Sequence, residues 1–152
     1  MVLPFCSFPS APSNPVTCNS GAVMPSWFDI HKIPVTADSP KDESGVLKAV
    51  QNVHAMIDKE VAAGTDPNNV FVCGFSQGGA LTLTSVLLYP KKLGGGAVFS
   101  GWIPFNSSLI ERFPPDAKKV LIIQLYQSYV VHLNTFPFIF LSFLLCSNEM
   151  KM

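Results

Sequence analysis

The residues best suited to chemistry form the pentapeptide Gly74-Phe75-Ser76-Gln77-Gly78, which fits the pattern Gly-x-Ser-x-Gly. The pattern alone is a weak signal, because glycine and serine are common residues. Its surroundings strengthen it, since the apolar run Val70–Cys73 before it is typical of a buried strand and a helical pattern follows it. A sharp turn between strand and helix would lift the Ser76 hydroxyl above the sheet edge, and the glycines would let neighbouring backbone approach closely. We therefore predict a nucleophile elbow with Ser76 as the nucleophile.

The start of the helix after Ser76 suits a developing negative charge. The first N–H groups of a helix have no intrahelical acceptor, so they can stabilise an oxyanion. In an elbow of this kind the N–H of the residue after the nucleophile, here Gln77, forms half of the oxyanion hole. The competing interpretation is a glycine-rich turn in which Ser76 has no chemical role.

A helix over about residues 40–63 is the clearest element of the sequence. We expect Ser39 to cap it, Pro40 to occupy its first position, and Asp42 and Glu43 to lie in its first turn, where the helix dipole favours negative charge. Gly64 is expected to end it in a left-handed conformation. One apolar stripe recurs at steps of three and four residues: Val46, Ala49, Val50, Val53, Ile57 and Val61.

The order of the remaining elements predicts an α/β fold with a mostly parallel sheet and crossover helices. Residues 1–38 are expected to form a loop, because they contain many prolines, asparagines and glycines, although the apolar run Val23–Ile30 could form one buried turn or strand. The strand at 70–73 is expected to be buried on both faces. A helix over about 78–88 follows, and then strands within 94–100 and 118–125.

Composition narrows the possible functions. The chain has 152 residues, 48% of them hydrophobic and 13% charged, with zero formal net charge. This excludes an intrinsically disordered chain and argues against nucleic-acid binding. The four cysteines form no Cys-x-x-Cys pair and the first residues are a poor secretory signal, so we expect a cytoplasmic protein.

Five segments resemble the acyl-protein thioesterase and small carboxylesterase family (phospholipase/carboxylesterase type) in their order and spacing. The resemblance covers about residues 8–119, and the Met24 segment together with the elbow is its most specific part. The segments are Phe8-Pro9-Ser10-Ala11-Pro12, Pro15-Val16-Thr17, Met24-Pro25-Ser26-Trp27-Phe28-Asp29-Ile30, Gly74-Phe75-Ser76-Gln77-Gly78-Gly79-Ala80 and Ser100-Gly101-Trp102-Ile103-Pro104.

The resemblance implies an α/β-hydrolase fold and serine hydrolysis of acyl thioesters on lipidated proteins, or of simple carboxyl esters. It implies no metal and no organic cofactor, and its partners would be an acylated protein or a small acyl ester. Phe75, Trp102 and Ile103 would lie near the acyl chain. On residue type alone, the segment around Trp102 could equally be an ordinary loop that caps the core.

The catalytic partners of the serine do not follow the family pattern. A triad in this fold has the order Ser, Asp/Glu, His, yet no carboxylate occurs from Val120 to Asn148, and Asp116 precedes its strand. His132 is the only histidine after Ser76, and no glycine accompanies it. We expect His31 to lie on a surface loop and His54 to be solvated.

The two ends also depart from the pattern. The family's first strand and its glycine-rich oxyanion loop are not expected within Met1–Ser7, so the chain resembles a form truncated at both ends. We therefore divide it into a partial α/β-hydrolase domain at 1–125 and a divergent apolar tail at 126–152. Feeble hydrolysis or none is expected, because losing a triad partner removes several powers of ten in rate.

Three interpretations stay open. The first is a serine esterase or thioesterase that acts through Ser76. The second is a catalytically impaired form that binds acyl groups or a protein. The third is a membrane-anchored form, because the uncharged span from Val120 is long enough to cross a bilayer, although polar residues and Pro137 interrupt it.

Overall fold

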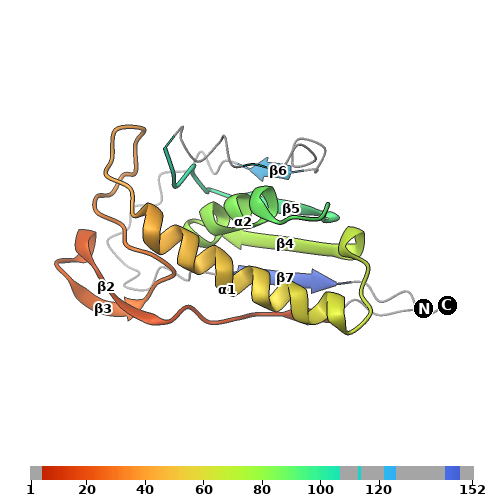
Figure 1. The fold of residues 1–152 in the computed structure, drawn as a ribbon. Coiled ribbons are helices and arrows are strands. Elements are labelled where there is room, and N and C mark those ends of the chain that lie inside the picture. The colour runs from red at the N-terminus through yellow and green to blue at the C-terminus, as the bar shows by residue number, and fades with distance from the viewer. Residues whose placement is uncertain (1–4, 107–112, 114–121, 126–142, 148–152) are drawn as a thin grey trace.

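The computed structural model describes residues 5–106, 113, 122–125 and 143–147, and its main feature is a five-stranded sheet with two helices (Figure 1). The strand order is β1-β7-β4-β5-β6. The strands are β1 (Phe5–Ser7), β4 (Val70–Phe75), β5 (Gly95–Phe99), β6 (Ile122–Leu125) and β7 (Phe143–Ser147), and the helices are α1 (Glu43–Ala62) and α2 (Gln77–Leu88).

The sheet is parallel where the sequence predicts parallel strands. β4 pairs with β5 and β5 with β6 in parallel, and α2 connects β4 to β5. β7 joins the other side of β4 in antiparallel orientation, and β1 pairs with β7 in the same way. The predicted α/β class and crossover helix are thus confirmed. β7 lies within the segment that we assigned to the apolar tail.

The N-terminal residues are more ordered than the loop that we expected over 1–38. β2 (Ser13–Val16) and β3 (Ala22–Pro25) form an antiparallel hairpin, joined through the 3-10 helix η1 (Thr17–Asn19) and left-handed residues Ser20 and Gly21. Proline is tolerated here because a two-stranded ribbon consists of edge strands. The expectation that Met1–Ser7 contains no strand is also wrong, since Phe5–Ser7 forms β1.

Helix α1 has its predicted apolar stripe but a different start. Its N-cap is Asp42, whose side chain accepts a hydrogen bond from the Gly45 N–H at 2.9 Å. The predicted cap, Ser39, lies before the helix, and its hydroxyl accepts from the Thr36 N–H instead. A carboxylate caps at least as well as a hydroxyl, so the helix begins three residues later than expected. Gly64 takes the predicted positive φ, at 109°.

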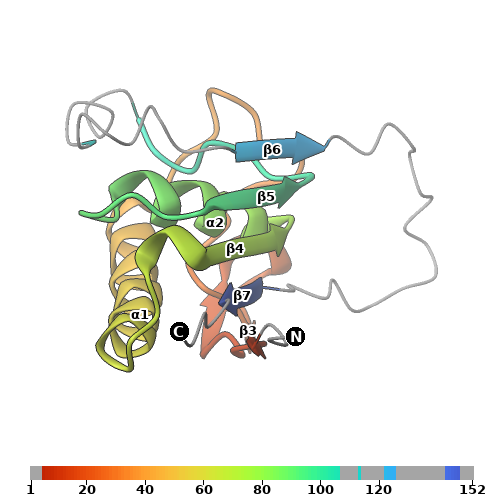
Figure 2. The same cartoon turned by 90° about the vertical axis from the view of Figure 1, so that its right-hand side faces the viewer.

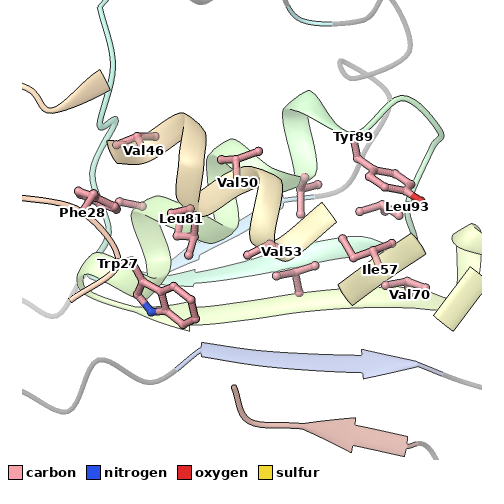
Figure 3. Packing of buried hydrophobic residues seen from close by; sticks show 14 residues of the cluster. Trp27, Phe28, Val46, Val50, Val53, Ile57, Val70, Leu81, Tyr89 and Leu93 are labelled. Atoms are coloured by element: carbon pink, nitrogen blue, oxygen red, sulfur yellow. The ribbon is translucent and has the colours of Figure 1, made fainter. Parts of the chain in front are cut away.

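The core lies between the two helices and one face of the sheet. Figure 2 shows α1 and α2 on the same side of the sheet. The α1 stripe packs against α2 and the buried residues of β4, as Figure 3 shows for Val50, Val53, Val70 and Leu81. Most of α2 is buried, in keeping with a helix that is apolar on all sides.

The prediction that β4 is buried on both faces is wrong for the described residues. Val70 and Val72 are fully buried, whereas Phe71 and Phe75 are 42% and 38% exposed. Side chains alternate between the two faces of a strand, and both described helices cover the face of Val70 and Val72. None of the described helices is long and apolar enough to span a bilayer.

Candidate active site

Ser76 lies at the corner between β4 and α2, as the sequence predicts. β4 ends at Phe75, α2 begins at Gln77, and Ser76 between them has φ 53° and ψ −116°. A positive φ is costly for any residue except glycine, so it persists only where the surrounding structure enforces it. The side chain is half-buried, and the Ser76 N–H donates to the Phe99 carbonyl at 2.8 Å. This is the geometry of a nucleophile elbow.

The elbow glycines have the steric role predicted for them. A Cβ on Gly74 would lie 2.1 Å from the carbonyl oxygen of Gly78, which real structures do not tolerate. A Cβ on Gly79 would lie 3.2 Å from Cα of Gly101, in the loop after β5. Strand β4 and helix α2 can therefore meet as closely as they do only because Gly74 lacks a side chain, and Gly79 lets the loop after β5 approach the start of α2 without displacement.

The backbone N–H of Gln77 is in the first turn of α2, where it has no intrahelical acceptor. It can therefore donate to an oxygen held above Ser76. The sequence pointed only to this backbone group and missed the side chain of Gln77, which is fully buried and hydrogen-bonded to the segment Ser26–Phe28. No sequence pattern indicates hydrogen-bond partners that lie about fifty residues away. The one signal is weak: Gln77 is a polar residue among glycines and apolar residues, which suggests that its side chain has a partner inside the protein.

The three residues expected near an acyl chain do not share one environment. Trp102 is half-buried, packs against the core and meets the ring of Phe28 edge-on at 6.4 Å between centroids. Ile103 is 56% exposed. Phe75 shares the exposed sheet face with Phe71. Their role in acyl binding stays a prediction.

Of the two described histidines, only His54 differs from its expected position. His54 is not solvated: its Nε2 lies 2.9 Å from the Ser85 carbonyl, and its ring meets Tyr89 edge-on. Burial lowers the pKa of His54, although the hydrogen bond to Ser85 opposes this effect. His31 lies in a loop with 35% of its side chain exposed, as expected, and its Nε2 is 3.7 Å from Oδ2 of Asp29.

Neither described histidine is placed as a base for Ser76. Ser85, the partner of His54, is nine residues further along α2 than Ser76, which corresponds to about 13 Å of helix. Among the described residues, no side chain hydrogen-bonds to the Ser76 hydroxyl, and no group of three His, Cys, Asp or Glu could hold a metal ion. Asp116 and His132 lie outside the described residues.

Two carboxylates, Asp29 and Asp42, hold the end of the segment Ser26–Phe28 that is hydrogen-bonded to Gln77. The Asp29 carboxylate accepts from the Thr17 N–H at 2.8 Å, and the Asp29 N–H donates to Asp42 at 2.9 Å. Burial alone would raise the pKa of each carboxyl group, but these hydrogen bonds hold the pKa of both below the ordinary value. Both groups are therefore expected to be ionised at neutral pH.

The sequence is similar to a known family and to proteins of plants. The sequence model of the family described as phospholipase/carboxylesterase matches residues 5–135. A "Probable carboxylesterase" of Oryza sativa subsp. japonica is 73% identical over 117 residues, which cover 77% of this chain and 44% of the relative. A "Probable inactive carboxylesterase" of the same organism is 61% identical over 120 residues, or 79% of this chain and 49% of the relative.

Solved structures agree with the sequence comparison. The crystal structure of Arabidopsis thaliana SOBER1 matches with a TM-score of 0.76 and 67% identity, over 78% of this chain and 56% of that one. Zea mays acyl-protein thioesterase 2 matches with a TM-score of 0.60 and 27% identity, over 76% and 55%. The chain thus spans about half the length of the curated relatives and solved structures that it matches.

Proposed function

Because this chain belongs to the phospholipase/carboxylesterase family, which has the α/β-hydrolase fold, we propose that it hydrolyses carboxylic esters or thioesters through Ser76. The observation that carries the proposal is the strained Ser76 between β4 and α2, with the Gln77 N–H beside it. This combination presents a nucleophilic oxygen and an oxyanion donor at one point, as acyl transfer requires.

The proposed reaction has two steps. The Ser76 oxygen attacks the acyl carbonyl while its proton passes to a general base, and the Gln77 N–H stabilises the resulting oxyanion. The alcohol or thiol then leaves with a proton, and an acyl group remains on Ser76. Water attacks this acyl-enzyme in the second step, which releases the acid and restores the serine. The described residues place no base beside Ser76, so we expect slow turnover.

Hydrolysis of p-nitrophenyl esters of increasing chain length tests this proposal on the intact chain. Ser76→Ala should abolish any turnover above the spontaneous rate, because it removes the nucleophile. Ser44→Ala is the matched control, since Ser44 is exposed on α1 and should leave the rate unchanged. Equal rates for Ser76→Ala and the wild type would refute the proposal.

The substrate class follows from family likeness. We propose an acylated protein or a small acyl ester as the partner, encountered in the cytoplasm. The name of the maize structural neighbour supports a thioester, and the names of the plant relatives support a carboxyl ester. Parallel assays with a palmitoyl-thioester peptide and the oxygen ester of the same acyl group would distinguish them.

A second candidate is a module that binds acyl groups without hydrolysing them. The observation that favours it is the lack of a base beside Ser76 among the described residues. The name of one relative, "Probable inactive carboxylesterase", is consistent with a loss of hydrolysis. Saturable binding of a fatty acid with no ester turnover would support this candidate. Turnover that depends on Ser76 would exclude it.

A further inference from the structure

The Gln77 side chain makes three hydrogen bonds inside the protein. Its Oε1 accepts from the Trp27 N–H at 2.9 Å, and its Nε2 donates to the Phe28 carbonyl at 2.7 Å and to the Ser26 hydroxyl at 2.9 Å. The side chain is completely buried. Because both N–H groups and the carbonyl of the amide have partners, the orientation of this side chain is fully specified.

The segment that receives these bonds is itself held firmly. The Ser26 N–H donates to the Pro12 carbonyl at 2.9 Å, and the Ser26 hydroxyl donates to the Phe28 carbonyl at 2.6 Å. On the far side, the Asp29 N–H donates to the carboxylate of Asp42, the N-cap of α1. Gln77 is therefore bonded to a segment that the hairpin and α1 already fix in place.

The same residue borders one of the three non-glycine residues of the described backbone that have a positive φ. Ser76 has φ 53°, and a non-glycine residue leaves this region unless contacts on both sides restrain it. On one side the Ser76 N–H is bonded to Phe99 in β5. On the other side the next residue, Gln77, is bonded through its side chain to Ser26–Phe28.

We propose that the Gln77 side chain is a positioning residue that clamps the Ser26–Phe28 segment to the elbow and so holds Ser76 and the Gln77 N–H in their reactive orientation. The clamp also fixes the position of Phe28 relative to Ser76, and the ring of Phe28 meets Trp102 edge-on. Figure 3 shows Phe28 and Trp27 at the end of the core near Leu81. The catalytic part of this inference rests on the proposed function, whereas the restraint of the backbone does not.

Three variants, Gln77→Met, Gln77→Glu and Ser26→Ala, and one control test the clamp. Gln77→Met keeps the length of the side chain and removes all three hydrogen bonds. Ser26→Ala removes only one of these three hydrogen bonds, at a residue outside the elbow. It provides the test if Gln77→Met does not fold. Gln51→Met is the matched control, because Gln51 is exposed on α1.

Two measurements are made on each protein. The first is hydrogen–deuterium exchange of the peptides that contain residues 26–29 and 75–78. The second is the rate at which a fluorophosphonate probe labels Ser76, divided into probe affinity and maximal rate. The first readout does not depend on catalysis, so an unlabelled wild type would refute the proposed function without deciding the clamp.

The clamp predicts that Gln77→Met exchanges faster than the wild type in both peptides. Its maximal labelling rate should be about 10-fold to 100-fold lower with probe affinity unchanged, because a displaced reacting group lowers the rate constant. Ser26→Ala should change both readouts in the same direction by less, and Gln51→Met should change neither. Gln77→Glu should approach the wild type at low pH, where its protonated carboxyl group can again donate to Phe28. Exchange in both peptides at the wild-type rate in Ser26→Ala, or in a folded Gln77→Met, would overturn the inference.

Discussion

At the scale of single residues, the elbow depends on positions that lack a side chain. Gly74 and Gly78 approach so closely that a Cβ on Gly74 would overlap the carbonyl group of Gly78. The positive φ of Ser76 is the conformational consequence of this tight turn. The Gly-x-Ser-x-Gly pattern was therefore informative because it encodes a steric requirement as well as a chemical one.

Gly74→Ala should lower the free energy of unfolding by about 3 kcal/mol, because the new methyl group forces β4 and α2 apart. Gly21→Ala is a useful comparison: its methyl group meets nothing within 4 Å, and its cost of about 1 kcal/mol comes only from the positive φ of 75°. Urea denaturation at neutral pH measures both values. Equal losses in the two variants would contradict the role of close approach at the elbow.

His54 makes the stability of the chain depend on pH. Burial lowers the pKa of its folded form, so the unfolded chain binds a proton more readily. Stability is then fully present above the unfolded pKa, about 6.5, and falls as the pH is lowered through that value. His54→Gln should flatten this loss between pH 7 and pH 5, as followed by thermal unfolding. Gln51→Met, at an exposed position of α1 that does not titrate, should keep the wild-type slope, and an equally steep slope in His54→Gln would refute the prediction.

At the scale of elements, the sequence predicted the helices well because each has a strong local pattern. The α1 stripe follows a 3.6-residue period and is buried as expected. The helix start was misplaced because Ser39 and Asp42 both suit a cap, and the tertiary hydrogen bond from the Asp29 N–H to Asp42 contributes to the choice. Such a contact across thirteen residues leaves no local signal.

Asp42→Ala should destabilise the chain by about 1 to 2 kcal/mol, since it removes the N-cap and the acceptor for the Asp29 N–H. The contribution of Asp42 should also be lost as the pH falls through its lowered folded pKa, because the protonated carboxyl group accepts these bonds poorly. Chemical denaturation at neutral pH and at pH 3 measures both effects. Asp38→Ala, at an exposed carboxylate before the helix, is the control, and equal losses in the two variants would contradict the capping role.

At the scale of the whole molecule, the described sheet has one covered face and one apolar face with considerable exposure. Phe71, Phe75, Phe99 and Ile123 lie on the second face and are 38–50% exposed. The sequence predicted that the strand at 70–73, now β4, is buried on both faces, because a run of apolar residues does not show whether both faces are covered. Exposed apolar surface of this kind favours association between chains.

Ile123→Lys should raise the concentration at which the chains begin to associate, because Ile123 lies on the exposed face of β6, at an edge of the sheet. Ile33→Lys gives a matched control, since Ile33 is 57% exposed but lies in a loop. Light scattering over a concentration series distinguishes the two. The prediction fails if both lysine variants change association equally.

The position of Ser76 was predictable because strand, elbow and helix are contiguous in the chain. The Gln77 side-chain contacts were not, because they connect segments about fifty residues apart. The sequence contains no Asp/Glu and His in the order and setting that the family's triad requires, and the described histidines contact other groups. The local sequence thus predicted the position of Ser76 between strand and helix, whereas the contacts around it could be found only in the fold.

The central claim, that Ser76 is the nucleophile at a strained elbow, is tested most directly by treating the intact chain with a fluorophosphonate and mapping the adduct by peptide mass spectrometry. We expect slow labelling confined to the peptide that contains Ser76, and none in Ser76→Ala. Fast labelling at Ser76 would keep the nucleophile but show that a base is present. No adduct after prolonged exposure, or an adduct that persists in Ser76→Ala, would contradict the claim.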